Sequence, residues 1–281
     1  MYKLRYVSDN GGEIVLDFDH GYIINTVDGV TGRTVKLQTA QGFEQIGDTV
    51  TSMSLGGQIL TIKGRIPLQN ISAKRAMLRI FQPLSHGRLY WEDKYYIDVF
   101  VKDSPQISQE RHSTFLLGLY APYPYWQKVN QSRYELGGLT AEFMFPLNYA
   151  MPHRFGSTTI ETQFNAYNAG DCASSFALTI TAGEADLTNF AVTDVNTQKA
   201  IKFIGTLDAG KRLEMYRENG QLYIKIDGTT DAFDMLDDTS DLYSLSAGDN
   251  VLLFTADSGA SSAKVSITFN ESYVGVLADG V

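Results

Sequence analysis

Apolar and polar residues alternate along the first half of the chain, in short runs separated by turn residues. The runs 2–7 and 13–18 flank Asp9-Asn10-Gly11-Gly12, a pattern typical of a β-hairpin. Similar runs predict five further strands, at 34–39, 59–66, 88–91, 95–101 and 114–120. Because the run 95–101 is almost continuously apolar, we expect both of its faces to be covered.

Residues 72–82 have a helical period instead. Their apolar positions recur every three or four residues, at Ala73, Met77, Ile80 and Phe81. Ser72 is the expected N-cap, and Pro83 ends the element. The first half therefore predicts a β-rich domain with one short helix packed on it.

The segment 30–58 contains several glycines and alternating Thr and Val. This pattern fits a long hairpin that projects from the core. It fits a compact part of the sheet equally well. A projecting hairpin could lie across a neighbouring molecule and contribute to self-association.

The segment 121–127 interrupts the strand pattern with Pro122 and Pro124. Each proline fixes φ and lacks a backbone donor, so neither a helix nor a central strand continues through it. We interpret Pro122, Pro124 and Trp126 as an interdomain linker whose aromatic side chains hold the exit segment onto the first domain. The predicted boundaries are an N-terminal domain at 1–127, a connector at 128–162 and a C-terminal domain at 163–281.

The second half predicts a β-sandwich or jelly roll. Short strand-like runs follow one another between turns, and Asn219-Gly220 is its strongest hairpin signal. There are seven such runs, at 176–182, 191–194, 199–204, 212–216, 221–226, 251–255 and 263–269. The fold class is therefore mainly β, and the length of 281 residues fits two domains.

Charge is divided unevenly between the halves. Residues 1–150 carry 15 Lys and Arg against 14 Asp and Glu, whereas residues 151–281 carry 8 against 18. The net charge of −10 in the second half argues against nucleic-acid and membrane partners, which require a basic surface. The chain shows no signal-peptide pattern and no apolar run long enough for a membrane helix, so we expect synthesis in the cytosol.

Side chains that could carry catalysis or hold a cofactor are scattered. The four histidines, His20, His86, His112 and His153, form no pair at metal-ligand spacing. Asp17 and Asp19 could share a strand face, which is the minimum for glycoside hydrolysis, but solvated carboxylates explain them more simply. We expect no enzyme, no cofactor and no metal.

Two other features have simple structural explanations. The six aspartates from Asp227 to Asp241 do not follow the spacing of a calcium loop and fit an acidic surface loop better. The lone cysteine, Cys172, is expected to be buried and inert.

Aromatic residues are abundant, with 16 Tyr, 15 Phe and 2 Trp. Most are expected in the core. Exposed Tyr or Trp on a sandwich can stack on sugars or anchor a protein interface, so a carbohydrate-binding adhesin remains an alternative.

An ordered series of short pieces resembles the distal tail protein family of long-tailed bacteriophages. In the first half the pieces are 60–66, the helix with Ala73-Lys74-Arg75, Gly87-Arg88-Leu89-Tyr90-Trp91, 95–101 and 120–126. In the second half they are 168–171, 178–180, the Gly210 turn, 226–228, 246–250 and 272–276. The resemblance covers nearly the whole chain.

This resemblance implies a structural protein of a phage or prophage tail, found at the tail tip of the virion and assembled in the cytoplasm of the bacterial host. It implies a homohexameric ring formed by the N-terminal domain, with galectin-like C-terminal domains. The implied partners are the tail tube protein, the tail-tip protein and, in some relatives, receptor-binding proteins. The family has no catalytic residues to carry over, and the assembly interface stays unassigned.

Overall fold

The computed structural model describes residues 3–67, 70–136, 139–140, 157–158, 163–218 and 220–277. The chain divides into two compact units. The first comprises Met1–Asn130 with Ser272–Val281, and the second Gln131–Glu271. Each unit has its own hydrophobic core.

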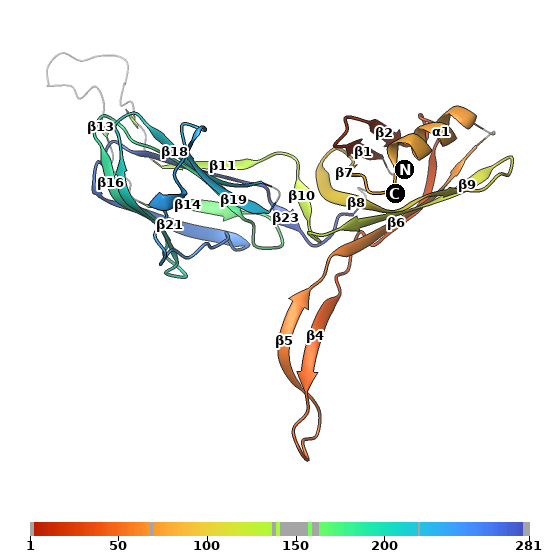
Figure 1. Ribbon diagram of the computed structural model, residues 1–281, viewed down its shortest axis with the longest axis horizontal. Coiled ribbons are helices and arrows are strands. Elements are labelled where there is room, and N and C mark those ends of the chain that lie inside the picture. The colour runs from red at the N-terminus through yellow and green to blue at the C-terminus, as the bar shows by residue number, and fades with distance from the viewer. Residues whose placement is uncertain are drawn as a thin grey trace, which may run out of the picture. The chain divides into compact units, whose positions relative to one another are not determined.

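A nine-stranded antiparallel sheet forms most of the first unit (Figure 1). Its strand order is β2-β1-β7-β8-β9-β6-β3, with β10 beside β8 and β23 beside β10. The strands are β1 (Leu4–Ser8), β2 (Glu13–Leu16), β3 (Ile23–Asp28), β6 (Gln58–Ile66), β7 (His86–Trp91), β8 (Tyr95–Ile107), β9 (Ser113–Ala121), β10 (Trp126–Lys128) and β23 (Ser272–Tyr273).

Alternation along these strands gives the sheet one buried face. On β6, for example, Leu60, Ile62 and Ile66 are fully buried, whereas Lys63 and Arg65 are exposed. On β8 the outward Asp98 and Phe100 are exposed, so the expectation that both faces of 95–101 are covered is wrong. The run looks continuously apolar because Phe100, which faces solvent, is itself apolar; only one face of the strand is covered.

The single helix of the described chain, α1 (Ile71–Ile80), buries Ala73, Met77 and Ile80. Its N-cap is Asn70, whose side chain accepts a hydrogen bond from the Ala73 backbone N–H at 3.1 Å, and not Ser72. The Tyr22 hydroxyl donates to the Ala73 carbonyl at 2.9 Å, and burial raises the pKa of Tyr22 to about 12. This bond ties the helix to the chain just before β3.

The segment 30–58 contains a separate hairpin of β4 (Val35–Ala40) and β5 (Thr49–Leu55), drawn in orange in Figure 1. Every residue from 34 to 55 is exposed. Of the two structures that the sequence allowed, the hairpin that stands out from the core is therefore the correct one.

The chain reaches the second unit later than the predicted linker. Trp126 is fully buried in the first core, and its ring N–H donates to the Val30 carbonyl at 3.2 Å. Pro122 and Pro124 precede β10 within the same unit. The aromatic side chain thus fixes the exit segment to the first unit.

The end of the chain also differs from the predicted boundary at 163–281. Residues 272–277 return to the first unit, where β23 pairs with β10 and Val276 joins the core. Two apolar-rich segments far apart in sequence pair here, and local patterning contains no signal for such a pairing.

Two antiparallel sheets over one core form the second unit, which makes it a β-sandwich. One sheet has the order β11-β22-β15-β18-β19-β20, and the other β14-β21-β16-β17. The strands are β11 (Ser132–Leu136), β14 (Gln163–Asn168), β15 (Phe176–Thr181), β16 (Leu187–Asp194), β17 (Ala200–Leu207), β18 (Arg212–Glu218), β19 (Gln221–Ile226), β20 (Thr230–Asp231), β21 (Gly248–Ser258) and β22 (Lys264–Phe269).

Two short elements complete the described part of this unit. A ladder of β12 (Leu139–Thr140) and β13 (Ser157–Thr158) pairs apart from both sheets, and a 3₁₀ turn, η1, spans Phe233–Met235. The predicted mainly β fold with one helix and a C-terminal sandwich is confirmed. Within the predicted connector 128–162, β11 is a full strand of the first sandwich sheet.

Candidate assembly surfaces

The hairpin β4–β5 has one apolar and one polar face. Its register pairs Val35 with Leu55, Leu37 with Met53 and Thr39 with Val50, which places the five large apolar side chains on one face. The exposed fractions of Leu37 and Met53 are 55% and 73%. No residue of the described chain covers this apolar face.

The polar face of the hairpin satisfies its own hydrogen bonds. The Ser52 hydroxyl donates to the Gln38 side-chain oxygen at 2.8 Å, and the Thr51 hydroxyl donates to the Gln38 carbonyl at 3.0 Å. Lys36 and Ser54 pair across the same face. The polar side chains therefore hydrogen-bond within the hairpin, whereas the apolar side chains of the other face remain exposed to solvent.

The tip between the two strands is apolar and acidic. Phe43 and Ile46 are almost completely exposed, at 97% and 101%. Glu44 and Asp48 stand beside them, and all four side chains point into solvent. Solvent-exposed aromatic and aliphatic side chains at a protruding tip are typical of a contact with another protein.

The outer face of the nine-stranded sheet carries a second uncovered apolar surface. The register aligns His86 with Phe100, Phe100 with Tyr120 and Tyr120 with Ile59, a row across four strands. The His86 ring stacks on Phe100 at 5.3 Å and 16°. Phe100, Tyr120 and Ile59 are 46%, 38% and 46% exposed.

Arginine side chains cover the neighbouring aromatic residues of this face. The Arg5 guanidinium lies 3.9 Å from the centre of the Tyr90 ring, and that of Arg88 lies 4.2 Å from the Tyr96 ring. Arg88 also donates to Asp98 at 2.8 Å. The face is therefore apolar in the row defined above, with ion-paired arginines beside it.

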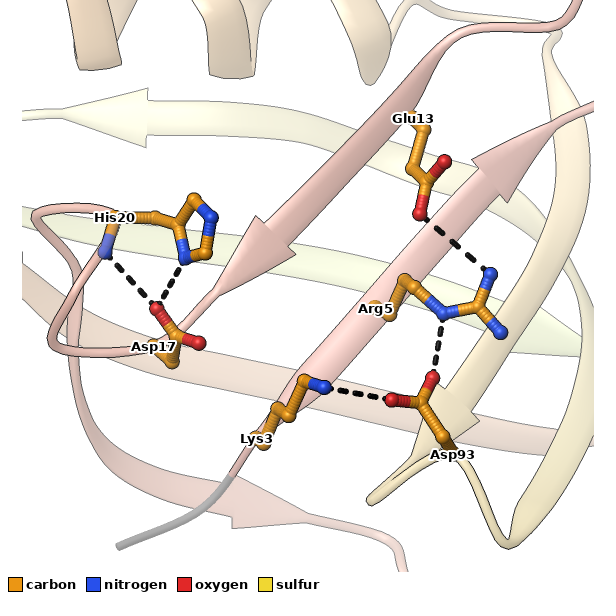
Figure 2. Close-up of polar contacts among 6 residues, drawn as sticks. All are labelled: Lys3, Arg5, Glu13, Asp17, His20 and Asp93. Atoms are coloured by element: carbon orange, nitrogen blue, oxygen red, sulfur yellow. Dashed lines mark hydrogen bonds and ion pairs between the residues drawn. The ribbon is translucent and has the colours of Figure 1, made fainter.

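Ion pairs fix the edge of this sheet (Figure 2). Asp93, in the turn between β7 and β8, accepts from Lys3 at 2.7 Å and from Arg5 at 2.5 Å, and Arg5 also approaches Glu13 at 3.5 Å. The hydrogen bonds from Lys3 and Arg5 lower the pKa of Asp93. This cluster anchors the turn to β1 and has the character of a structural network.

The candidate catalytic pair does not show the properties of a hydrolase site. The Asp17 Oδ1 atom lies 2.6 Å from the His20 ring Nδ1 and accepts a hydrogen bond from the His20 backbone N–H at 2.9 Å (Figure 2). Burial opposes ionisation of Asp17, but these hydrogen bonds outweigh it and lower its pKa. A general acid needs a raised pKa. Asp19 is exposed in the same turn.

The other histidines also stay apart. His86 contacts Asp9 and stacks on Phe100, His112 is exposed, and His153 lies outside the described residues. In the acidic segment Asp227 binds Lys211 at 2.9 Å and Asp237 accepts from the Thr239 N–H at 2.6 Å. Within the described ranges no group of three His, Cys, Asp or Glu side chains could hold a metal ion.

Two remaining expectations concern Cys172 and the membrane. Cys172 is half-buried, not buried as expected, because it lies in the loop after β14 rather than in the core. Among the parts of the chain that the structure describes, no helix has the length and hydropathy to cross a membrane.

The class of protein follows from the sandwich and from the sequence match over it. Residues 169–273 match the family model of the siphovirus-type tail component, C-terminal domain. The resemblance to the distal tail protein family is thereby confirmed, for the part of the chain that forms most of the sandwich. A comparison with curated proteins finds no match by sequence.

Among solved structures the chain is similar to the Dit protein (gp 19.1) of phage SPP1, described as a paradigm of the hub adsorption apparatus in phages that infect Gram-positive bacteria. The TM-score is 0.70 at 10% identity, over 97% of this chain and 99% of that one, so the two share a fold. Baseplate structures of phage P2 with Ca and with Sr match at 10% identity and TM-scores of 0.49 and 0.47, over 98% of this chain and 99% of theirs.

The uncovered apolar surfaces were only partly predictable. The alternation in 30–58 indicated a hairpin, but sequence does not reveal that its apolar face stays uncovered. The row on the outer sheet face was missed, because Phe100 and Tyr120 sit in apolar runs that resemble core strands.

Proposed function

We propose that the protein is a structural hub of a phage or prophage tail and not an enzyme. In this proposal six copies form a ring through the first unit, and the ring joins the tail tube to the tail-tip protein. The second unit, a galectin-like sandwich, is the docking module for further tail-tip components such as receptor-binding proteins. The protein is made in the host cytoplasm and resides at the tail tip of the virion.

The match of residues 169–273 to a tail-component family is the observation that carries this proposal. The shared fold over nearly the whole chain supports it, because the first unit then also has a counterpart in a tail protein. The ring itself is supported by a different feature. One chain presents two separate uncovered apolar surfaces, and head-to-tail rings of identical copies need two different surfaces.

Light scattering on the purified full-length protein over a wide concentration range tests the proposal. The expected result is a mass that reaches six times the 31.1 kDa of one chain and stays there on further concentration. A protein that remains at 31.1 kDa, or that grows without limit, contradicts the closed ring.

A carbohydrate-binding adhesin remains the second candidate, because of one feature of the sandwich. Tyr216 and Tyr223 stack at 5.6 Å on the outward side of β18 and β19, and the Lys225 ammonium lies 5.4 Å from the Tyr223 ring. Half-exposed tyrosines of this kind can stack on a sugar. A glycan array probed with the full-length protein decides between the two: reproducible binding that is lost in Tyr223→Ala favours the adhesin.

A further inference from the structure

The hairpin β4–β5 has the composition of a docking element and lacks a docking site in its own chain. A two-stranded hairpin is at best marginally stable in water unless one face is packed. Here Val35, Leu37, Val50, Met53 and Leu55 share one face, and all of them are exposed. Packing of this face against another surface would therefore stabilise the hairpin.

The outer face of the nine-stranded sheet offers a surface of matching kind. The row Phe100, Tyr120 and Ile59 is apolar, lies on three neighbouring strands and is also uncovered. Gly57 fits closely against it, since a Cβ there would clash with the Tyr120 hydroxyl. This close approach holds the Tyr120 ring in place in the row.

A hollow of about 530 Å³ opens on the same side of the sheet, near the ends of β6 and β9. Its lining includes Lys63, Thr114 and Leu116, whose side chains alternate outward like those of the row. The tip residues Phe43 and Ile46 are of a size to enter such a hollow. The apolar face and the tip of the hairpin thus each have a matching surface on the outer face of the sheet: the apolar row and the hollow.

Charge favours the same pairing. The hairpin tip carries Glu44 and Asp48, both exposed. Arg65 is exposed on β6 near the hollow, and Lys63, which lines the hollow, is already paired with Asp28 at 2.8 Å. Opposite charges around an apolar contact fix its register and speed its formation, and such a contact weakens with salt.

We infer that the apolar face and tip of the hairpin dock onto the outer face of the nine-stranded sheet of a second copy of this chain. The occupant is a second copy because both surfaces are uncovered within one chain and are complementary in apolar character and in charge. The contact is heterologous, so repeating it from copy to copy closes a ring. The inference rests on the proposed ring and assigns the surfaces that form it.

Disulfide trapping between two variants tests the contact. Both variants carry Cys172→Ser, and one adds Met53→Cys while the other adds Phe100→Cys. Mixed under mild oxidation, they are expected to form a disulfide between copies, identified by peptide mass mapping as joining position 53 to position 100. The matched control replaces Met53→Cys by Ser54→Cys, its neighbour on the polar face, and is expected to give at least tenfold less of that product.

A second pair of variants keeps the test independent of crosslinking chemistry. The double variant Leu37→Asp with Met53→Asp is expected to reduce the particle from six copies to a single chain of 31.1 kDa, a sixfold loss of mass. The control Gln38→Asp with Ser52→Asp places the same charges on the polar face and is expected to leave the ring intact. Neither pair replaces a core residue, so both variants should remain folded, as circular dichroism can check.

The outcomes separate this inference from the proposed function. If the wild type forms a ring and the Leu37→Asp, Met53→Asp variant still forms it, the docking is overturned but the ring is not. The same holds if the cysteine variants give no disulfide between positions 53 and 100. A wild-type protein that never exceeds 31.1 kDa contradicts the ring itself.

Discussion

The hairpins β4–β5 and β18–β19 are built to the same plan and placed in opposite environments. Both are antiparallel and alternate apolar with polar residues. In β18–β19 the inward side chains Leu213, Met215 and Ile224 are buried in the sandwich core. In β4–β5 the corresponding apolar face is exposed. Alternation thus specifies a hairpin, but it does not specify whether the rest of the chain covers the hairpin's apolar face.

The largest expected effect comes from shortening the exposed hairpin. Replacing residues 41–48 by an Asn-Gly turn removes Phe43, Ile46 and both acidic side chains of the tip. We expect the six-copy ring to be lost and a folded monomer of about the wild-type chain mass to remain, measured by light scattering and circular dichroism. Rings that persist without the tip would show that it is not needed for closure.

Truncating one apolar side chain in each hairpin sharpens the comparison. Ile224→Ala removes a fully buried side chain and is expected to lower the free energy of unfolding of the second unit by about 2–5 kcal/mol. Leu37→Ala, at 55% exposure, is expected to change that of the monomeric first unit by less than about 0.5 kcal/mol. Urea titrations of the two variants give both values. Equal losses would mean that the monomer already buries the hairpin's face.

A smaller effect is expected from the backbone of the two turns. Gly47 and Gly220 have φ values of +85° and +80°, and a Cβ at either position would meet nothing within 4 Å. Alanine is strained at such angles by about 1 kcal/mol. Gly220→Ala should destabilise the second unit by that amount, whereas Gly47→Ala should leave monomer unfolding unchanged because the exposed hairpin can open locally. The same urea titrations apply, and a measurable loss for Gly47→Ala would couple the hairpin to the core.

The smallest effect concerns charge at the edge of the nine-stranded sheet. Lys3 and Arg5 lower the pKa of Asp93, so its contribution to stability is complete above the unfolded value of about 3.9 and is lost as the pH falls through the lower folded value. Because these side chains are partly exposed, Asp93→Asn should cost less than about 1 kcal/mol at pH 7. The difference between variant and wild type should vanish in strong acid. A difference that grows below pH 4 would contradict the assigned ion pairs.

Local patterning predicted much of the fold. The expected strand at 59–66 is β6 (Gln58–Ile66), and the expected helix at 72–82 is α1 (Ile71–Ile80). These elements were predictable because period and turn residues are local properties. The N-cap was misplaced by two residues, since both Asn70 and Ser72 can cap a helix and only geometry selects between them.

Pairings between distant segments were not predictable. The return of residues 272–277 to the first unit depends on β10 offering a free edge, and no local signal marks that edge. The extension of β8 to Ile107 passes through register shifts between Val101 and Gln106, which hide the alternation. For the candidate assembly surfaces, sequence supplies the apolar residues but not their exposure, which is the property on which the proposed contact depends.

Negative-stain images of the full-length wild-type protein test the central claim most directly. The account predicts rings of six copies, with six-fold symmetry and a central channel. Class averages with two-fold symmetry, or single copies at every concentration, would contradict the proposed hub.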